Sequence, residues 1–119
     1  MAIRNIPTNE EIKDELTGLQ EAFENAHGKD AFMDVYIKHF NERPSMRADN
    51  FNRSAHIPLM AYFFSYALGR PDQRYLDAFK LEACKPWAGM KDAESFSPAE
   101  VIKDLHSAVD QFLPEHHAA

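Results

Sequence analysis

The sequence predicts an all-α protein, a compact bundle of about five helices around one buried helix at residues 57–69. Apolar residues make up 45% of the 119 positions, enough for one hydrophobic core. β-Branched residues, which fill the pleated surface of a sheet, number only 11. Apolar side chains recur at helical spacing between start and stop signals, with no linker or repeat, so we expect a single domain over residues 1–119.

The first helix is expected at residues 9–27. Thr8 and Glu11 form a capping box before it, and Gly28 supplies the left-handed residue that commonly ends a helix. Gly18 costs such a helix about 1 kcal/mol relative to alanine, which predicts that a second helix approaches closely there. The apolar stripe consists of Ile12, Leu16, Leu19, Phe23 and Ala26.

The next two predicted helices differ in how much of their surface is apolar. Asp30 can cap a helix at residues 31–42, where apolar side chains cover more than half the circumference and Arg43-Pro44 ends the helix. After a polar loop, the third helix starts near Ser54–Pro58 and ends at Gly69. Because the third helix is apolar on every side, we expect it to be the central element.

Two further helices complete the predicted bundle. The fourth, at residues 72–84, follows a turn so short that it must form an antiparallel hairpin with the third. A connector over residues 86–96 contains Trp87 and Met90. Ser97 and Glu100 then form a second capping box, which starts a helix that ends before Pro114.

Charge is unevenly distributed along the chain. Residues 9–34 hold eight acids and two bases, a net charge of −6, whereas residues 35–91 have a net charge of +4 and residues 92–119 a net charge of −5. The acidic side chains of the two ends either keep helix surfaces hydrated or bind a basic partner. Aromatic and methionine side chains in a connector are also typical of interfaces. The predicted partner-binding residues are Glu10, Asp14, Glu21, Glu24, Trp87 and Met90.

No motif indicates a catalytic or metal centre, so neither a cofactor nor a metal is expected. The glycines are scattered, so they form no phosphate-binding loop. Cys84 is the single cysteine of the sequence, which favours a reducing, cytoplasmic location. Glu24-x-x-His27 has di-iron spacing but occurs once, at the end of a helix where the dipole favours histidine. The candidate anion-binding residues, which can alternatively pair with acidic helices, are Arg43, Arg47, Arg53 and His56.

A short pattern in the middle of the chain resembles the truncated haemoglobins. Tyr36, Pro44 and Phe51 stand where that family has its distal tyrosine, following proline and corner phenylalanine, and Leu68-Gly69-Arg70-Pro71 resembles its Leu-Gly-Gly-Pro run, with Tyr75 downstream. The resemblance implies a haem between the second, third and fourth helices. The iron-ligating histidine of the family falls at Cys84 here.

The function expected from these observations is non-catalytic binding of a basic protein partner, as an immunity- or antitoxin-type inhibitor or an accessory subunit of an enzyme. One alternative is a helical protein that holds haem or another flat apolar ligand. Another is a small enzyme that uses His56 or His39 with a nearby carboxylate. A net charge of −6 disfavours nucleic acid, and no apolar run approaches the roughly 20 residues of a membrane span.

Overall fold

Helices account for all the regular structure in the computed structural model, which describes residues 6–43, 53–83 and 98–113. The predicted all-α bundle is therefore confirmed. None of the helices in this part of the chain is long and apolar enough to cross a membrane. The elements are α1 (Asn9–His27), the π-helix η1 (Phe32–Phe40), the 3₁₀ turn η2 (Arg53–Ala55), α3 (His56–Ala67), α4 (Gln73–Ala83) and α5 (Pro98–Phe112).

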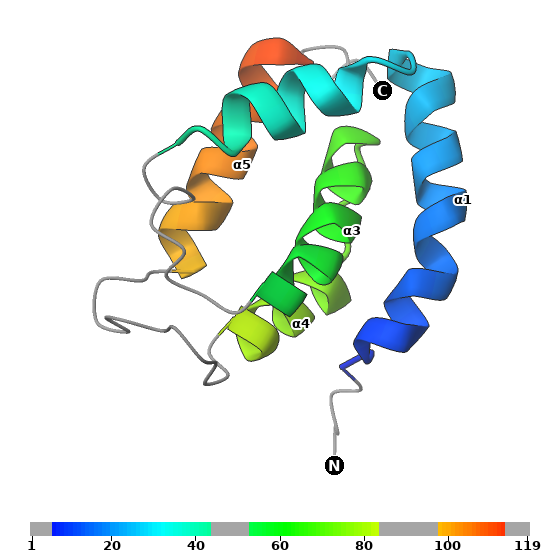
Figure 1. Ribbon diagram of the computed structural model, residues 1–119, viewed down its shortest axis with the longest axis vertical. Coiled ribbons are helices and arrows are strands. Elements are labelled where there is room, and N and C mark those ends of the chain that lie inside the picture. The colour runs from blue at the N-terminus through cyan, green and yellow to red at the C-terminus, as the bar shows by residue number, and fades with distance from the viewer. Residues whose placement is uncertain (1–5, 44–52, 84–97, 114–119) are drawn as a thin grey trace.

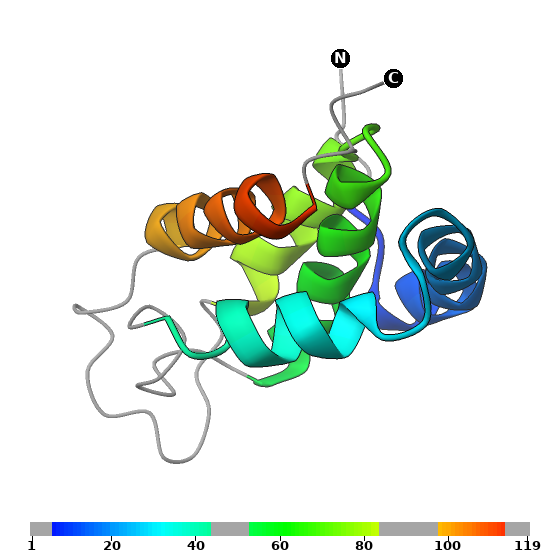
Figure 2. The same cartoon turned by 90° about the horizontal axis from the view of Figure 1, so that it is seen from above.

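Helix α3 lies in the centre of the bundle (Figure 1). It packs against α1, α4 and α5, and seen from above it lies between α1 and α5 with η1 crossing beside it (Figure 2). This arrangement confirms the prediction that the helix with apolar residues on every side is the central one. Its buried residues are Pro58, Leu59, Ala61, Tyr62, Phe63, Phe64, Ser65 and Ala67.

Phe63 of α3 packs against aromatic rings from both α1 and η1. It is completely buried, and its ring centroid lies 5.4 Å from that of Phe23 on α1. From η1, the rings of Tyr36 and Phe32 meet it edge-on, at 5.1 Å and 6.1 Å. Edge-to-face pairs contribute about 0.5–1.5 kcal/mol each beyond the area they bury. One side chain thus holds α1 and η1 against the central helix.

The second helix differs from its prediction in both length and type. The segment expected at residues 31–42 is a π-helix over Phe32–Phe40, in which the Asn41 N–H donates to the Tyr36 carbonyl five residues earlier. Asp30 does not cap it, because Ala31 holds the N-cap position without a side-chain hydrogen bond. Residues four apart share one face of the helix. The Tyr36 ring contacts both Phe32 and Phe40 on that face.

Helix α1 has the predicted bounds, and its capping box and left-handed Gly28 are both present. The expectation for Gly18 is wrong. This residue is exposed, and a Cβ atom built on it would meet nothing within 4 Å, so no helix approaches there. Helix α1 packs on α3 through Ile12 and Phe23, which lie on either side of Gly18 along the helix.

The hairpin of α3 and α4 is held by Ser65, the buried polar side chain in the described core. Its hydroxyl donates to the Tyr62 carbonyl at 2.9 Å and accepts from the Asp72 N–H at 3.2 Å. At the start of α4, Arg74 forms ion pairs with Asp72 and with Glu15 of α1. This arginine therefore links the start of α4 to α1.

A histidine of α5 joins that helix to α3. His106 Nε2 lies 2.8 Å from the Tyr62 hydroxyl, and its ring stacks on Tyr66 at 4.3 Å between centroids. Tyr66 donates to Asp110 at 2.9 Å, and burial, this bond and the Asp110 charge raise the pKa of Tyr66 to about 12. Burial lowers the pKa of His106, and the nearby Asp110 charge partly opposes that effect.

Replacing Gly18 or Gly28 with alanine is expected to change the free energy of unfolding in opposite directions. Gly18→Ala is expected to raise the free energy of unfolding by about 1 kcal/mol, because alanine favours the helix and the site is open. Gly28→Ala is expected to lower it by about 1–2 kcal/mol, because φ is +97° there. Urea unfolding of both variants measures the two changes. A loss of stability in Gly18→Ala would contradict the open environment of this residue.

His106 predicts a pH dependence of stability. The pKa of His106 is lower in the folded state than the ordinary value of 6.5, so the unfolded chain binds more protons near and below that pH. The free energy of unfolding therefore decreases as the pH is lowered. His106→Gln is expected to flatten this dependence. Asp110→Asn is expected to make it steeper, because the Asp110 charge raises the pKa of His106 and its removal lowers that pKa further. Urea midpoints between pH 7 and 5 measure it. Equal slopes in the wild-type protein and His106→Gln would contradict the prediction.

Candidate functional site

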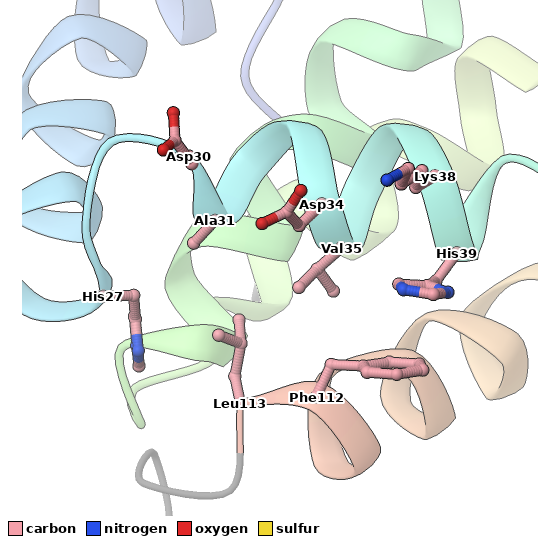
Figure 3. Close-up of a pocket in the computed structure, with 9 residues that line it drawn as sticks. All are labelled: His27, Asp30, Ala31, Asp34, Val35, Lys38, His39, Phe112 and Leu113. Atoms are coloured by element: carbon pink, nitrogen blue, oxygen red, sulfur yellow. The ribbon is translucent and has the colours of Figure 1, made fainter.

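A pocket of about 550 Å³ lies between η1 and the end of α5 (Figure 3). Helix α1 contributes its last residue, η1 contributes one side, and α5 contributes its last turn. The two faces meet because η1 packs on α5, while its Phe32 and Tyr36 rings contact Phe63 of α3. The residues that line the pocket are His27, Asp30, Ala31, Asp34, Val35, Lys38, His39, Phe112 and Leu113.

The charges of this pocket are separated along η1. Figure 3 shows Asp30 and Asp34 toward the N-terminal end of the helix and Lys38 and His39 toward the other end. A helix dipole favours carboxylates in the first turn and cations in the last, so this order also stabilises η1. The end of the pocket nearest α1 is therefore anionic, and the far end carries an ammonium group.

The remaining lining of the pocket is aromatic and apolar, and it comes from both η1 and the end of α5. Figure 3 shows the His39 ring lying over that of Phe112. The interplanar angle is 9° and the ring centroids are 3.8 Å apart. Phe112 is 38% exposed, whereas Val35 and Leu113 beside it are buried. A ligand in this pocket would meet carboxylates near α1 and apolar surface from both η1 and α5.

His27 has a structural partner. Its Nε2 lies 3.0 Å from the Ala67 carbonyl, which can only accept, so the proton is on Nε2. Ala67 is the last residue of α3, and this bond satisfies a carbonyl that the helix leaves unpaired. The Glu24-x-x-His27 spacing thus serves packing. Within the described ranges, no group of three or more histidine, cysteine, aspartate or glutamate residues is placed to hold a metal ion.

The predicted partner-binding residues of α1 form an outer acidic face. Glu10, Asp14 and Glu21 are exposed, and half-buried Glu24 accepts a hydrogen bond from Gln20 at 3.0 Å. Helix α1 packs mainly on α3, so this outer acidic face is turned to solvent. It ends one turn before His27, at the anionic end of the pocket. Trp87 and Met90 lie outside the described residues.

The predicted anion site is only partly described. Arg43 follows the end of η1, Arg53 starts η2, and Arg47 lies outside the described residues. His56 Nδ1 lies 3.3 Å from the hydroxyl of Tyr36, whose pKa is raised by burial, so the phenol keeps its proton. The anion-binding role of these residues stays a prediction.

The pocket contains residues to which the sequence reasoning gave other roles. Asp30 was expected to cap a helix, and Phe112 falls in the helix that was expected to end before Pro114. Both expectations followed from local spacing, whereas the pocket joins residues 27–39 to residues 112–113. The one available signal was the opposite charge at the two ends of η1.

No family model, curated protein or solved structure matches the chain. The resemblance to truncated haemoglobins therefore stays a prediction. Tyr36 is buried against Phe63, and Pro44, Phe51 and Cys84 of that pattern lie outside the described residues.

Proposed function

We propose that this protein is a non-catalytic module that binds a basic protein partner, and that the pocket between η1 and α5 accepts an arginine side chain of that partner. The observation that carries the proposal is the position of Asp30 and Asp34, whose carboxylates lie at the pocket end next to the outer acidic face of α1.

The chemistry of the pocket suits a guanidinium group. This planar cation donates two parallel hydrogen bonds to a carboxylate, and the aliphatic stem behind it packs on apolar side chains. Asp30 and Asp34 supply the carboxylates. The aliphatic stem of the arginine would contact Val35 and Leu113. Lys38 repels a cation from the far end, which leaves the Asp30 end as the favoured position.

The outer acidic face of α1 would attract the basic partner before the two proteins touch. Residues 9–34 carry a net charge of −6, and a concentrated field of one sign raises the rate of encounter with an oppositely charged protein. An inhibitor of a basic nuclease or toxin and an accessory subunit of an enzyme both fit this chemistry. A chain with one cysteine suits the reducing cytoplasm, where we place this binding.

A flat apolar ligand such as haem is less well supported. The rings expected to line its site pack on one another, with Phe63 in contact with Phe32, Tyr36 and Phe64. A histidine enzyme is also less well supported, because His56 pairs with the buried Tyr36 hydroxyl and His39 stacks on Phe112.

The arginine pocket is tested with a short, fluorescently labelled arginine-rich peptide as the probe. Asp34→Asn keeps the shape of the side chain and removes its charge, and it is expected to weaken binding about tenfold or more, as loss of a charge-assisted bond does. Fluorescence anisotropy titrations at fixed salt measure the affinity.

The matched control is Glu100→Gln, which removes one charge at the other end of α5, about 18 Å from Phe112. Its affinity is expected to stay near that of the wild-type protein. Equal losses in the two variants would show attraction by net charge alone, and unchanged affinity in Asp34→Asn would overturn the pocket as the binding site.

The outer acidic face is tested separately by association rates. Replacing Glu10, Asp14 and Glu21 with lysine is expected to slow association with the same peptide at least several-fold and to flatten its dependence on salt, because steering is screened by ions. Stopped-flow measurements over a range of ionic strength give both quantities. If on-rates are the same as for the wild-type chain, α1 has no steering role.

A further inference from the structure

A second pocket, of about 340 Å³, lies between α4 and α5. Its two walls come from single helix faces, because Leu76 and Lys80 are four residues apart on α4 and the α5 residues follow at spacings of three and four. The residues that line it are Leu76, Lys80, Ala99, Ile102, Lys103 and His106.

The charge of this pocket is opposite to that of the protein. Among the described residues that line it are two lysines and a histidine but no carboxylate, although the chain has a net charge of −6. Lys80 comes from α4 and Lys103 from α5, so one cation stands on each wall. An anion between these walls would be attracted from both sides.

Apolar surface makes up the rest of the lining. Leu76, Ile102 and Ala99 contribute it, and Ile102 is only 8% exposed. The volume is at the small end of the range for ligand pockets. A compact, strongly hydrated anion would gain nothing from these side chains. An anion with a short hydrocarbon chain would bury the chain against them.

His106 adds a hydrogen-bond donor. Its Nε2 faces the Tyr62 hydroxyl at 2.8 Å. When Tyr62 donates its proton to Nε2, the imidazole proton is on Nδ1, and this N–H is left to donate to a ligand. The stacked Tyr66 ring holds the imidazole in this orientation.

We propose that the pocket between α4 and α5 binds the carboxylate of a medium-chain fatty acid, with the carboxylate between Lys80 and Lys103 and the hydrocarbon chain on Leu76 and Ile102. This proposal does not depend on the basic protein partner, because it uses neither the outer acidic face nor the pocket beside η1.

Titration with decanoate tests the proposal, with amide chemical shifts and calorimetry as readouts. Shift changes are expected to concentrate in residues 76–80 and 99–106. Lys80→Met and Lys103→Met keep the stem of the side chain and remove the charge, and each is expected to weaken binding about tenfold.

Two controls make the outcome decisive. Lys38→Met removes a lysine from the pocket beside η1 and is expected to leave decanoate affinity unchanged. Decanol, the uncharged analogue, is expected to bind at least tenfold more weakly than decanoate. Absence of decanoate binding, equal affinity for decanol, or an equal loss in Lys38→Met would each overturn the proposal.

Discussion

Burial of the rings around Phe63 is the interaction on which the rest of the structure depends. Helix α3 is apolar on every side, so it is stable only when other helices cover it completely. Phe63 meets Phe23 of α1 and Tyr36 of η1, and these contacts set where both helices lie. With its aromatic side held on α3, η1 turns Val35 and His39 toward α5. The pocket beside η1 is a consequence of that orientation.

Polar groups inside the bundle find their partners on different helices. His27 of α1 bonds the last carbonyl of α3, Tyr62 of α3 bonds His106 of α5, and Tyr75 of α4 donates to Glu15 of α1. A buried polar group without a partner costs about 1–3 kcal/mol, so such pairs disfavour other packings of the same helices. Apolar packing brings the helices together, and these bonds select one arrangement of them.

The two pockets differ in the sign of their charged side chains, although α5 contributes to both. The last turn of α5 lines the pocket that contains Asp30 and Asp34, whereas Lys103 and His106 from its earlier turns line the pocket that contains Lys80. A 15-residue helix extends about 22 Å, so its two ends meet different neighbours. The guanidinium group and the fatty carboxylate that we propose as ligands would therefore bind at separate places on one small bundle.

Local signals in the sequence determined the helices. The capping box at Thr8, the left-handed Gly28 and the all-round apolar surface of residues 57–69 act over a few residues, so α1 and the central position of α3 were predictable, as was the acidic surface of α1. Only the tertiary structure decided the π-helix, the partners of the histidines and both pockets. Helical spacing shows which residues share a face but not what that face meets. The pairings of Tyr62 with His106 and of His39 with Phe112 arise only when segments distant in the sequence pack together.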